Sequence, residues 1–138
     1  MSYAFAGAAQ AALHAALTAH PEIAALATGG VHDEPPQGAA GRAATGPYVL
    51  IGDEAVSPWG AGDLAGAAHA VEIAVVGAAL GFAALKRIAA AVSDAALGPL
   101  SIQGARVVSA RFLGARTRRG REGMRRIDLR FRLIVEPA

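Results

Sequence analysis

The sequence contains no cysteine and only one tryptophan, and aromatic residues make up 5% of it. The absence of cysteine excludes a disulfide framework and a metal site built from thiolates. Long hydrophobic runs are also missing, because the charge-free apolar stretch at 73–85 is too short to span a bilayer. Residues 1–21 are uncharged, but they lack the basic leading segment of a signal peptide. We therefore expect a protein without a membrane segment that is soluble and intracellular where it is made.

Motifs of common catalytic sites are absent as well. There is no nucleophile elbow, P-loop, dinucleotide-binding glycine fingerprint or HExxH zinc motif. His32, Asp33 and Glu34 come nearest to a metal cluster, and we favour their interpretation as a polar strand end before a proline turn. Asp53 and Glu54 could act as an acid/base pair, but no candidate nucleophile or base accompanies them. The sequence therefore predicts neither an enzyme nor a cofactor or metal site.

Bulky apolar residues are modest in number, since 36 residues are alanine and 17 are glycine. Alanine buries little area, so a lone protomer would be only moderately stable and would rely on neighbours. The length fits one domain spanning 1–138.

Charge is unevenly distributed along the chain. Residues 106–132 hold ten arginines against Glu122 and Asp128, which gives +8, whereas the remainder has three basic and nine acidic residues, which gives −6. Such a protein could bind nucleic acid through its cationic part, or copies of itself through opposite charges. Only the second use explains why both signs are present.

The cationic part has the pattern of a β-hairpin. Ile127, Leu129, Phe131 and Leu133 alternate with charged residues, which predicts a half-buried strand at 126–133. Upstream, Val108, Ala110 and Phe112 share one parity, and the polar, glycine-containing stretch 118–123 predicts the turn between the two runs. We expect a long antiparallel hairpin with one apolar face and one arginine-rich face.

The other elements complete an α+β pattern. We predict helices at 3–19, with Ser2 as N-cap, at 21–27 and at 81–97, and strands at 31–34, 47–52 and 68–76. Segments 35–46 and 53–66 are expected to be loops, the second carrying Trp59. The fold class is therefore α+β, a mostly antiparallel sheet with two main helices on one face and a long C-terminal hairpin.

Three uses of the arginine face remain open on the residues alone. It could be a subunit interface paired with carboxylates, a solvated face, or a nucleic-acid surface, and we favour them in that order. The exposed parity of the last strand lacks aromatic residues for base stacking. Trp59 could fold back onto the core or anchor an interface.

In succession, these segments resemble the tail-terminator family of long-tailed phages, especially its version in gene transfer agents. The segments that carry the resemblance are 11–17, 35–38, 47–54, Trp59, 66–69, 81–86, 111–119 and 126–132. The resemblance implies a homo-hexameric ring at the head-proximal end of the tail, in the neck of the particle. Such a ring stops growth of the tail tube, contacts the tail-tube protein and the head-tail connector, and lets DNA pass through its bore without specific binding. A small nucleic-acid-binding protein and another neck protein are the alternatives.

A ring needs contacts between two different patches, which a protein with segregated charges can supply. We therefore predict that subunit, tube or connector contacts involve the hairpin arginines, with carboxylates and the tryptophan among the partners. The predicted interface residues are Arg111, Arg116, Arg118, Arg119, Arg121, Arg126, Arg130, Arg132, Trp59, Asp53, Glu54 and Glu72.

Overall fold

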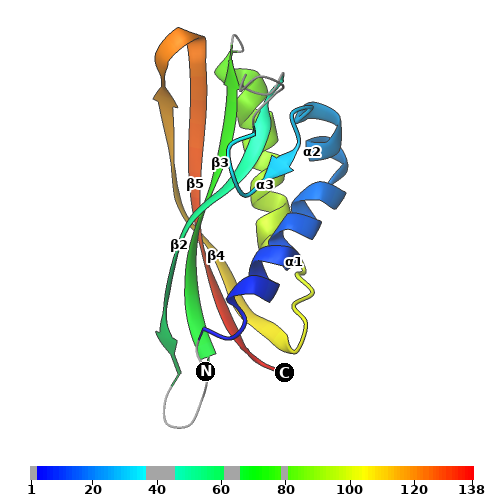
Figure 1. Ribbon diagram of the computed structural model, residues 1–138, viewed down its shortest axis with the longest axis vertical. Helices are drawn as coiled ribbons and strands as arrows, with labels where there is room; N and C mark the ends of the chain where they lie inside the picture. The colour runs from blue at the N-terminus through cyan, green and yellow to red at the C-terminus, as the bar shows by residue number, and fades with distance from the viewer. Residues whose placement is uncertain (1–2, 37–45, 61–65, 79–80) are drawn as a thin grey trace.

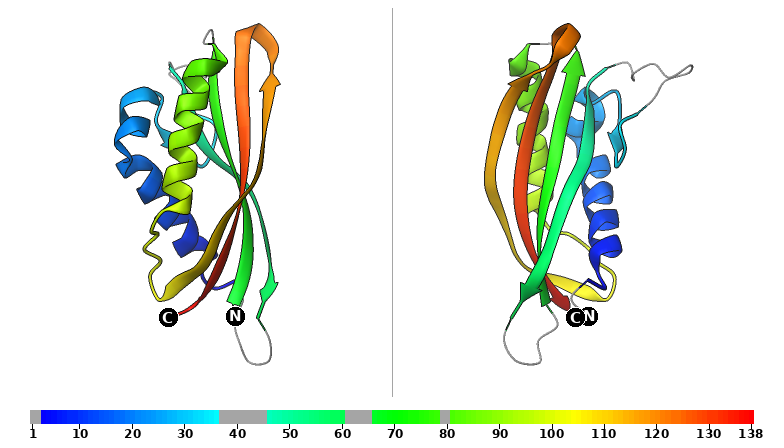
Figure 2. Two further views of the ribbon diagram at one scale, coloured as in Figure 1. Left: turned by 180° about the vertical axis from the view of Figure 1, so that it is seen from behind. Right: turned by 60° about the vertical axis from the view of Figure 1, so that its left-hand side comes forward.

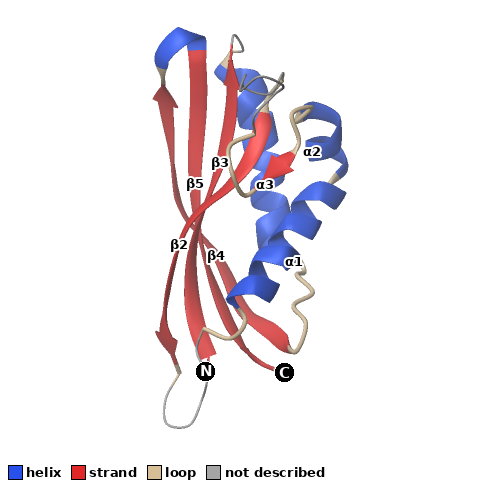
Figure 3. Ribbon diagram, viewed as in Figure 1, coloured by secondary structure: helices blue, strands red, loops and turns tan. Residues whose placement is uncertain are grey.

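The computed structural model describes residues 3–36, 46–60, 66–78 and 81–138. Its core is a five-stranded sheet in the order β1-β2-β3-β5-β4, with the helices on one face of the sheet (Figures 1 and 3). The elements are α1 (Ala6–Ala19), α2 (Pro21–Leu26), β1 (Val31–His32), β2 (Tyr48–Trp59), β3 (Gly66–Ala78), α3 (Phe82–Leu97), β4 (Ala105–Arg119) and β5 (Met124–Pro137). The predicted α+β fold is confirmed.

Neighbouring strands run antiparallel throughout the sheet except at β1, which pairs parallel with β2 over two residues. The four long strands are strongly twisted, and the second view in Figure 2 shows them in front of the helices. Among the described residues no helix or strand covers the other face of the sheet, which we call the open face. The molecule therefore has one covered face and one face available for contacts.

The terminal hairpin forms as its alternation predicts. Ile127, Leu129, Phe131 and Leu133 are all buried on the covered face. A short 3-10 turn, Arg121–Gly123, joins β4 to β5, and Glu122 and Gly123 both have positive φ. Glycine adopts that backbone conformation without the steric penalty that other residues meet. The turn therefore depends on the backbone conformation of its own residues, whereas the pairing of β4 with β5 depends on burial of the apolar face.

Helices α1 and α3 supply the other half of the core. Leu13 and Leu17 of α1, and Leu85, Ile88 and Val92 of α3, are buried in one cluster with the covered face of the sheet. Their spacing of three, four and seven residues places them on one helix side. Burial of such side chains stabilises the fold by about 1.5–3 kcal/mol each.

The predicted start of the first helix is wrong. Residues 3–5 form turns, and α1 begins at Ala6 with Phe5 in the cap position and no side-chain cap. Ser2, the predicted cap, lies outside the described residues. The Phe5 carbonyl accepts a hydrogen bond from Ala9 N–H, but the Phe5 side chain cannot cap the first turn, so alanine-rich packing rather than side-chain capping holds this end.

The predicted loop at 53–66 is also wrong in its first half. Strand β2 continues to Trp59, after a register shift between Ile51 and Glu54. The shift is a bulge, and it hid the strand because it breaks the alternation. Pro58 misled the prediction too, since β2 lies at the edge of the sheet there, where proline is tolerated. Residues 61–65 of this predicted loop, and 37–45 of the loop at 35–46, lie outside the described residues.

Strand β4 departs from the predicted parity. Its pairing with β5 shifts between Val107 and Ser109 and again between Phe112 and Gly114. As a result Val108 is 45% exposed instead of buried, whereas Ala110 packs against the core. Phe112 is half exposed and packs against Phe131, with ring centroids 5.8 Å apart and the ring planes tilted by 58°. The two bulges leave a regular stretch, residues 109–112, between them.

Candidate interaction surface

Most arginines of the hairpin lie on the open face. Directly paired residues of an antiparallel ladder point to the same side, so residues that alternate with buried Leu129 and Phe131, and their partners on β4, point away from the core. These arginines are Arg106, Arg111, Arg116, Arg118, Arg126, Arg130 and Arg132. The predicted arginine-rich face therefore exists as one surface across two strands.

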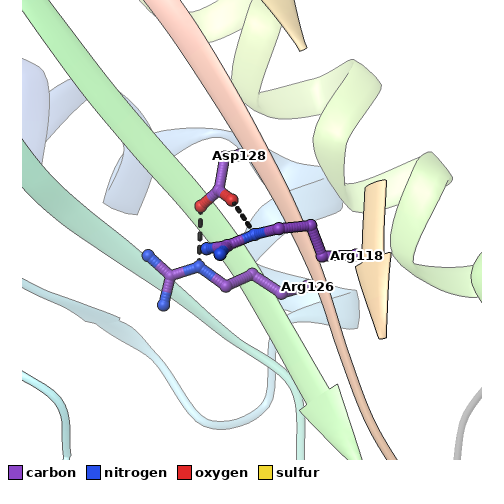
Figure 4. Close-up of polar contacts among 3 residues, drawn as sticks. All are labelled: Arg118, Arg126 and Asp128. Atoms are coloured by element: carbon purple, nitrogen blue, oxygen red, sulfur yellow. Dashed lines mark hydrogen bonds and ion pairs between the residues drawn. The ribbon is translucent and has the colours of Figure 1, made fainter. Parts of the chain in front are cut away.

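Asp128 organises the centre of this surface. Its carboxylate accepts a hydrogen bond from Nε of Arg118 at 2.8 Å and another from Nε of Arg126 at 2.6 Å (Figure 4). Asp128 is only 7% exposed, so its charge is largely removed from water and both contacts are strengthened. Two guanidinium groups are thus fixed on one carboxylate, with a net charge of +1. Arg118 and Arg126 were predicted to make subunit, tube or connector contacts, and both already have a partner within the chain.

A polar groove of about 440 Å³ lies beside this cluster on the open face. It is lined by Arg116, Arg118 and Arg130, with Asp128 and Glu72 opposite. Gly114 gives the groove its floor, since a Cβ there would meet nothing within 4 Å and the residue has φ +156. The absence of a side chain therefore opens the groove instead of satisfying close packing.

A second groove of about 320 Å³ shares Glu72 and Arg130 with the first. It is lined also by Asp53 and Glu54 of β2 and by Leu113 of β4. Four predicted interface residues from three strands therefore meet in one place on the sheet. Glu72 lies directly opposite Arg130 in the ladder, and the described residues show no ion pair between them.

Four other arginines of the open face have no carboxylate partner within the described part of the chain. Among the described residues, Arg111, Arg116, Arg130 and Arg132 form no ion pair. Arg106 pairs with Glu136 on the neighbouring strand. The open face thus combines neutralised arginines with a set whose charges are available to a partner.

Glu54 has a contact that the sequence did not indicate. Its Oε2 lies 3.3 Å from Nδ1 of His69, which is fully buried on β3. Nε2 of His69 has no hydrogen-bond partner among the described residues. The two residues are far apart in the sequence, and only the pairing of β2 with β3 brings them together, so no local pattern could have found this contact.

Two arginines at the hairpin tip contact an aromatic ring instead of a carboxylate. The guanidinium carbons of Arg119 and Arg125 lie 5.1 and 5.4 Å from the ring centroid of Phe82, at the start of α3. Arg121 is exposed in the turn. Arg119 and Arg121 were predicted as interface residues, whereas Arg125 and Phe82 were not singled out. Cation–π contacts of this kind attach the tip to the helix layer.

Trp59 lies at the end of β2 and is partly buried. Its ring lies so close to Gly66 that a Cβ on the glycine would come within 3.0 Å of Cε3. The indole therefore lies against its own sheet at Gly66. Its predicted role in an interface stays a prediction.

No group of three or more metal-ligating side chains occurs in the described ranges. Of the helices at 6–19, 21–26 and 82–97, none is long and apolar enough to cross a membrane.

The fold and the surface together define a small α+β protein that presents most of its hairpin arginines on an uncovered sheet face. The sequence matches the family model of the tail completion protein gp17 over residues 11–136, and the chain belongs to this family. The resemblance to phage tail-completion proteins is thereby confirmed.

A solved structure is similar over almost the whole chain. It is described as "Virion of native gene transfer agent (GTA) particle", and one of its chains is 45% identical. The match covers 98% of this chain and 99% of that chain, with a TM-score of 0.84. A search of curated proteins found no match.

Proposed function

We propose that this tail-completion protein is a tail terminator, acting as one domain over 1–138. Copies form a hexameric ring that ends polymerisation of the tail tube and joins the tail to the head-tail connector. DNA passes through the bore without specific binding. The ring lies in the neck of a virion or gene transfer agent particle and is assembled in the host cytoplasm. Family membership and the similarity to a chain of a gene transfer agent particle support this proposal.

The observation that carries the ring is the separation of charge within one fold. Arg111 and Arg116, which form no ion pair within the described residues, lie on β4, at one end of the strand order, while Asp53 and Glu54 lie exposed on β2, which is next to the other end. Two different patches of opposite charge favour contacts that repeat around an axis and close into a ring. A patch that matched itself would favour a simple dimer.

The ring is tested by measuring the mass of the purified protein by light scattering, alone and with the tail-tube protein. We expect a hexamer in at least one of these conditions, and addition of the ring should stop tube elongation in a turbidity assay. A strict monomer in both conditions, with unaltered tube growth, would contradict the proposal. A ring that binds the connector and leaves tube growth unchanged would identify another neck protein.

Nucleic-acid binding is the rival function, and the uncovered arginines favour it. Against it, both phenylalanines of the hairpin, Phe112 and Phe131, lie on the covered side, so the arginine face offers no aromatic ring for stacking on bases. Electrostatic binding to phosphates would weaken steeply with salt. Binding of duplex DNA at low salt by the wild type, lost in the double variant Arg111→Glu and Arg132→Glu, would support the rival. Absence of binding at low salt would exclude it.

A further inference from the structure

We propose that the outer edge of β4 in one copy pairs antiparallel with the outer edge of β2 in a second copy. The contact joins residues 109–112 to residues 54–57, so the sheet continues from copy to copy. This inference rests on the proposed ring and names the strands that close it.

Two long strand edges in the described chain lack a partner. Strand β4 pairs only with β5 along its whole length, and β2 pairs only with β3 beyond its two-residue contact with β1. An unpaired edge exposes a row of backbone N–H and C=O groups that can pair with another chain. Proteins usually protect such edges, so two long ones on one small domain indicate a partner for each.

Bulges confine regular pairing to one short stretch on each edge. On β4 the register shifts at Val107/Ser109 and Phe112/Gly114 leave residues 109–112 regular. On β2 the shift at Ile51/Glu54 and the proline at position 58, which has no N–H to donate, leave residues 54–57. Each edge thus offers four consecutive residues.

The two stretches lie at the same level of the sheet. Following the ladder from β2 through β3 and β5 to β4, Ser57 leads to Ala68, Ile134 and Ser109. The same path from Glu54 ends at Phe112. A second copy placed beside the first without a shift along the strands therefore brings one regular stretch directly against the other.

Strand direction fits this arrangement. The strands alternate in direction in the order β2-β3-β5-β4, so β2 and β4 of one chain run opposite to each other. Rotation about an axis along the strands preserves the direction of every strand, so β4 meets β2 of the next copy in antiparallel orientation. Each copy therefore pairs through its β4 edge with one neighbour and through its β2 edge with the other neighbour.

Side chains across the new pair are complementary. In straight register Arg111 lies opposite Ala55, two residues from Asp53, which lies in the bulge at the end of the regular stretch. Phe112, which is 49% exposed, lies opposite Glu54 and diagonal to Val56, which can cover the ring. The contact therefore buries an exposed aromatic ring and places an acidic residue near Arg111.

Disulfide trapping tests the pairing directly, because the chain has no cysteine of its own. We would combine Ser57→Cys with Ser109→Cys, two conservative changes on the open face. Within one chain these positions are three strand spacings apart, about 14 Å, which is too far for a disulfide. Under conditions in which the ring forms, mild oxidation should convert most of the protein into a ladder of covalent oligomers.

A matched control combines Ser57→Cys with Ser93→Cys on α3 and should give no ladder. Cysteine at Ala110, Arg111 or Phe112 in place of Ser109 reports a shifted register, and efficient trapping at any one of them also supports strand pairing. If rings assemble and none of the four positions is trapped with Ser57→Cys, the edge pairing is wrong while the ring stands. If no ring forms in any condition, the proposed function itself fails.

Discussion

Arg118 of β4 donates a hydrogen bond to Asp128 of β5 although the two residues are not direct partners in the ladder. The direct partner of Asp128 is Arg116, and that of Arg118 is Arg126. The diagonal contact leaves Arg116 facing the adjacent groove without an ion pair among the described residues. One buried carboxylate thus decides which arginines are neutralised and which are available.

The first prediction concerns this carboxylate. Asp128→Asn should lower the free energy of unfolding by about 1–2 kcal/mol, because Arg118 and Arg126 lose their partner while remaining adjacent. Both arginines are partly exposed, which keeps the loss below the roughly 3–5 kcal/mol expected when one partner of a fully buried pair is removed. Chemical denaturation measures it. Glu136→Gln, which removes the more exposed pair with Arg106, should change stability by less than about 0.5 kcal/mol, and equal losses in both variants would contradict this account.

The second prediction concerns the core of the hairpin. Phe131→Ala should lower the free energy of unfolding by about 3–5 kcal/mol, since the ring is fully buried and its removal leaves a cavity against the helices. Leu113→Ala, at a residue that is 44% exposed, is the matched control and should change stability by less than about 0.5 kcal/mol. Thermal and urea unfolding would both show the difference. A small loss for Phe131→Ala would mean that the covered face is less tightly packed than the structure indicates.

The hairpin could be predicted because its signals are local. The alternation in 126–133 predicts both the strand and its buried face, and the glycine-containing stretch before it predicts the turn. These signals agree with one another. The helix at 82–97 was predictable for the same reason. In these two segments the local sequence pattern and the tertiary packing favour the same secondary structure.

The two failures within the sheet have a common cause, which is the bulge. Bulges in β2 and β4 change the parity of the residues that follow them, so a strict period of two fails at Val108 and hides the strand at 53–59. For the interaction surface, the sequence predicted an arginine-rich face. It did not predict which of these arginines pair with a carboxylate of the same chain and which do not. The contacts of Glu54 with His69 and of Arg125 with Phe82 depend on which strands and helices become neighbours, which no local pattern encodes.

The third prediction concerns the hairpin tip. Phe82→Leu keeps an apolar side chain but removes the ring beneath Arg119 and Arg125, so it should lower the free energy of unfolding by about 1 kcal/mol. Amide hydrogen exchange at the tip should accelerate more than exchange in the central strands. Tyr3→Leu, at an aromatic residue that is exposed, is the control and should change neither quantity. Uniform acceleration over the whole sheet would contradict a local role for Phe82.

The fourth prediction separates charge pairing between copies from stability within one copy. Arg111→Glu and Asp53→Arg should each prevent ring assembly, because each places like charges across the proposed contact, and the double variant should restore it. Light scattering measures assembly, and circular dichroism verifies that each variant remains folded. Lys86→Glu makes the same change of charge at an exposed position of α3 and should leave assembly intact. Because the paired charges are partly exposed, added salt should weaken the defect of each single variant. A double variant that assembles no better than either single one would show that Arg111 and Asp53 do not meet between copies.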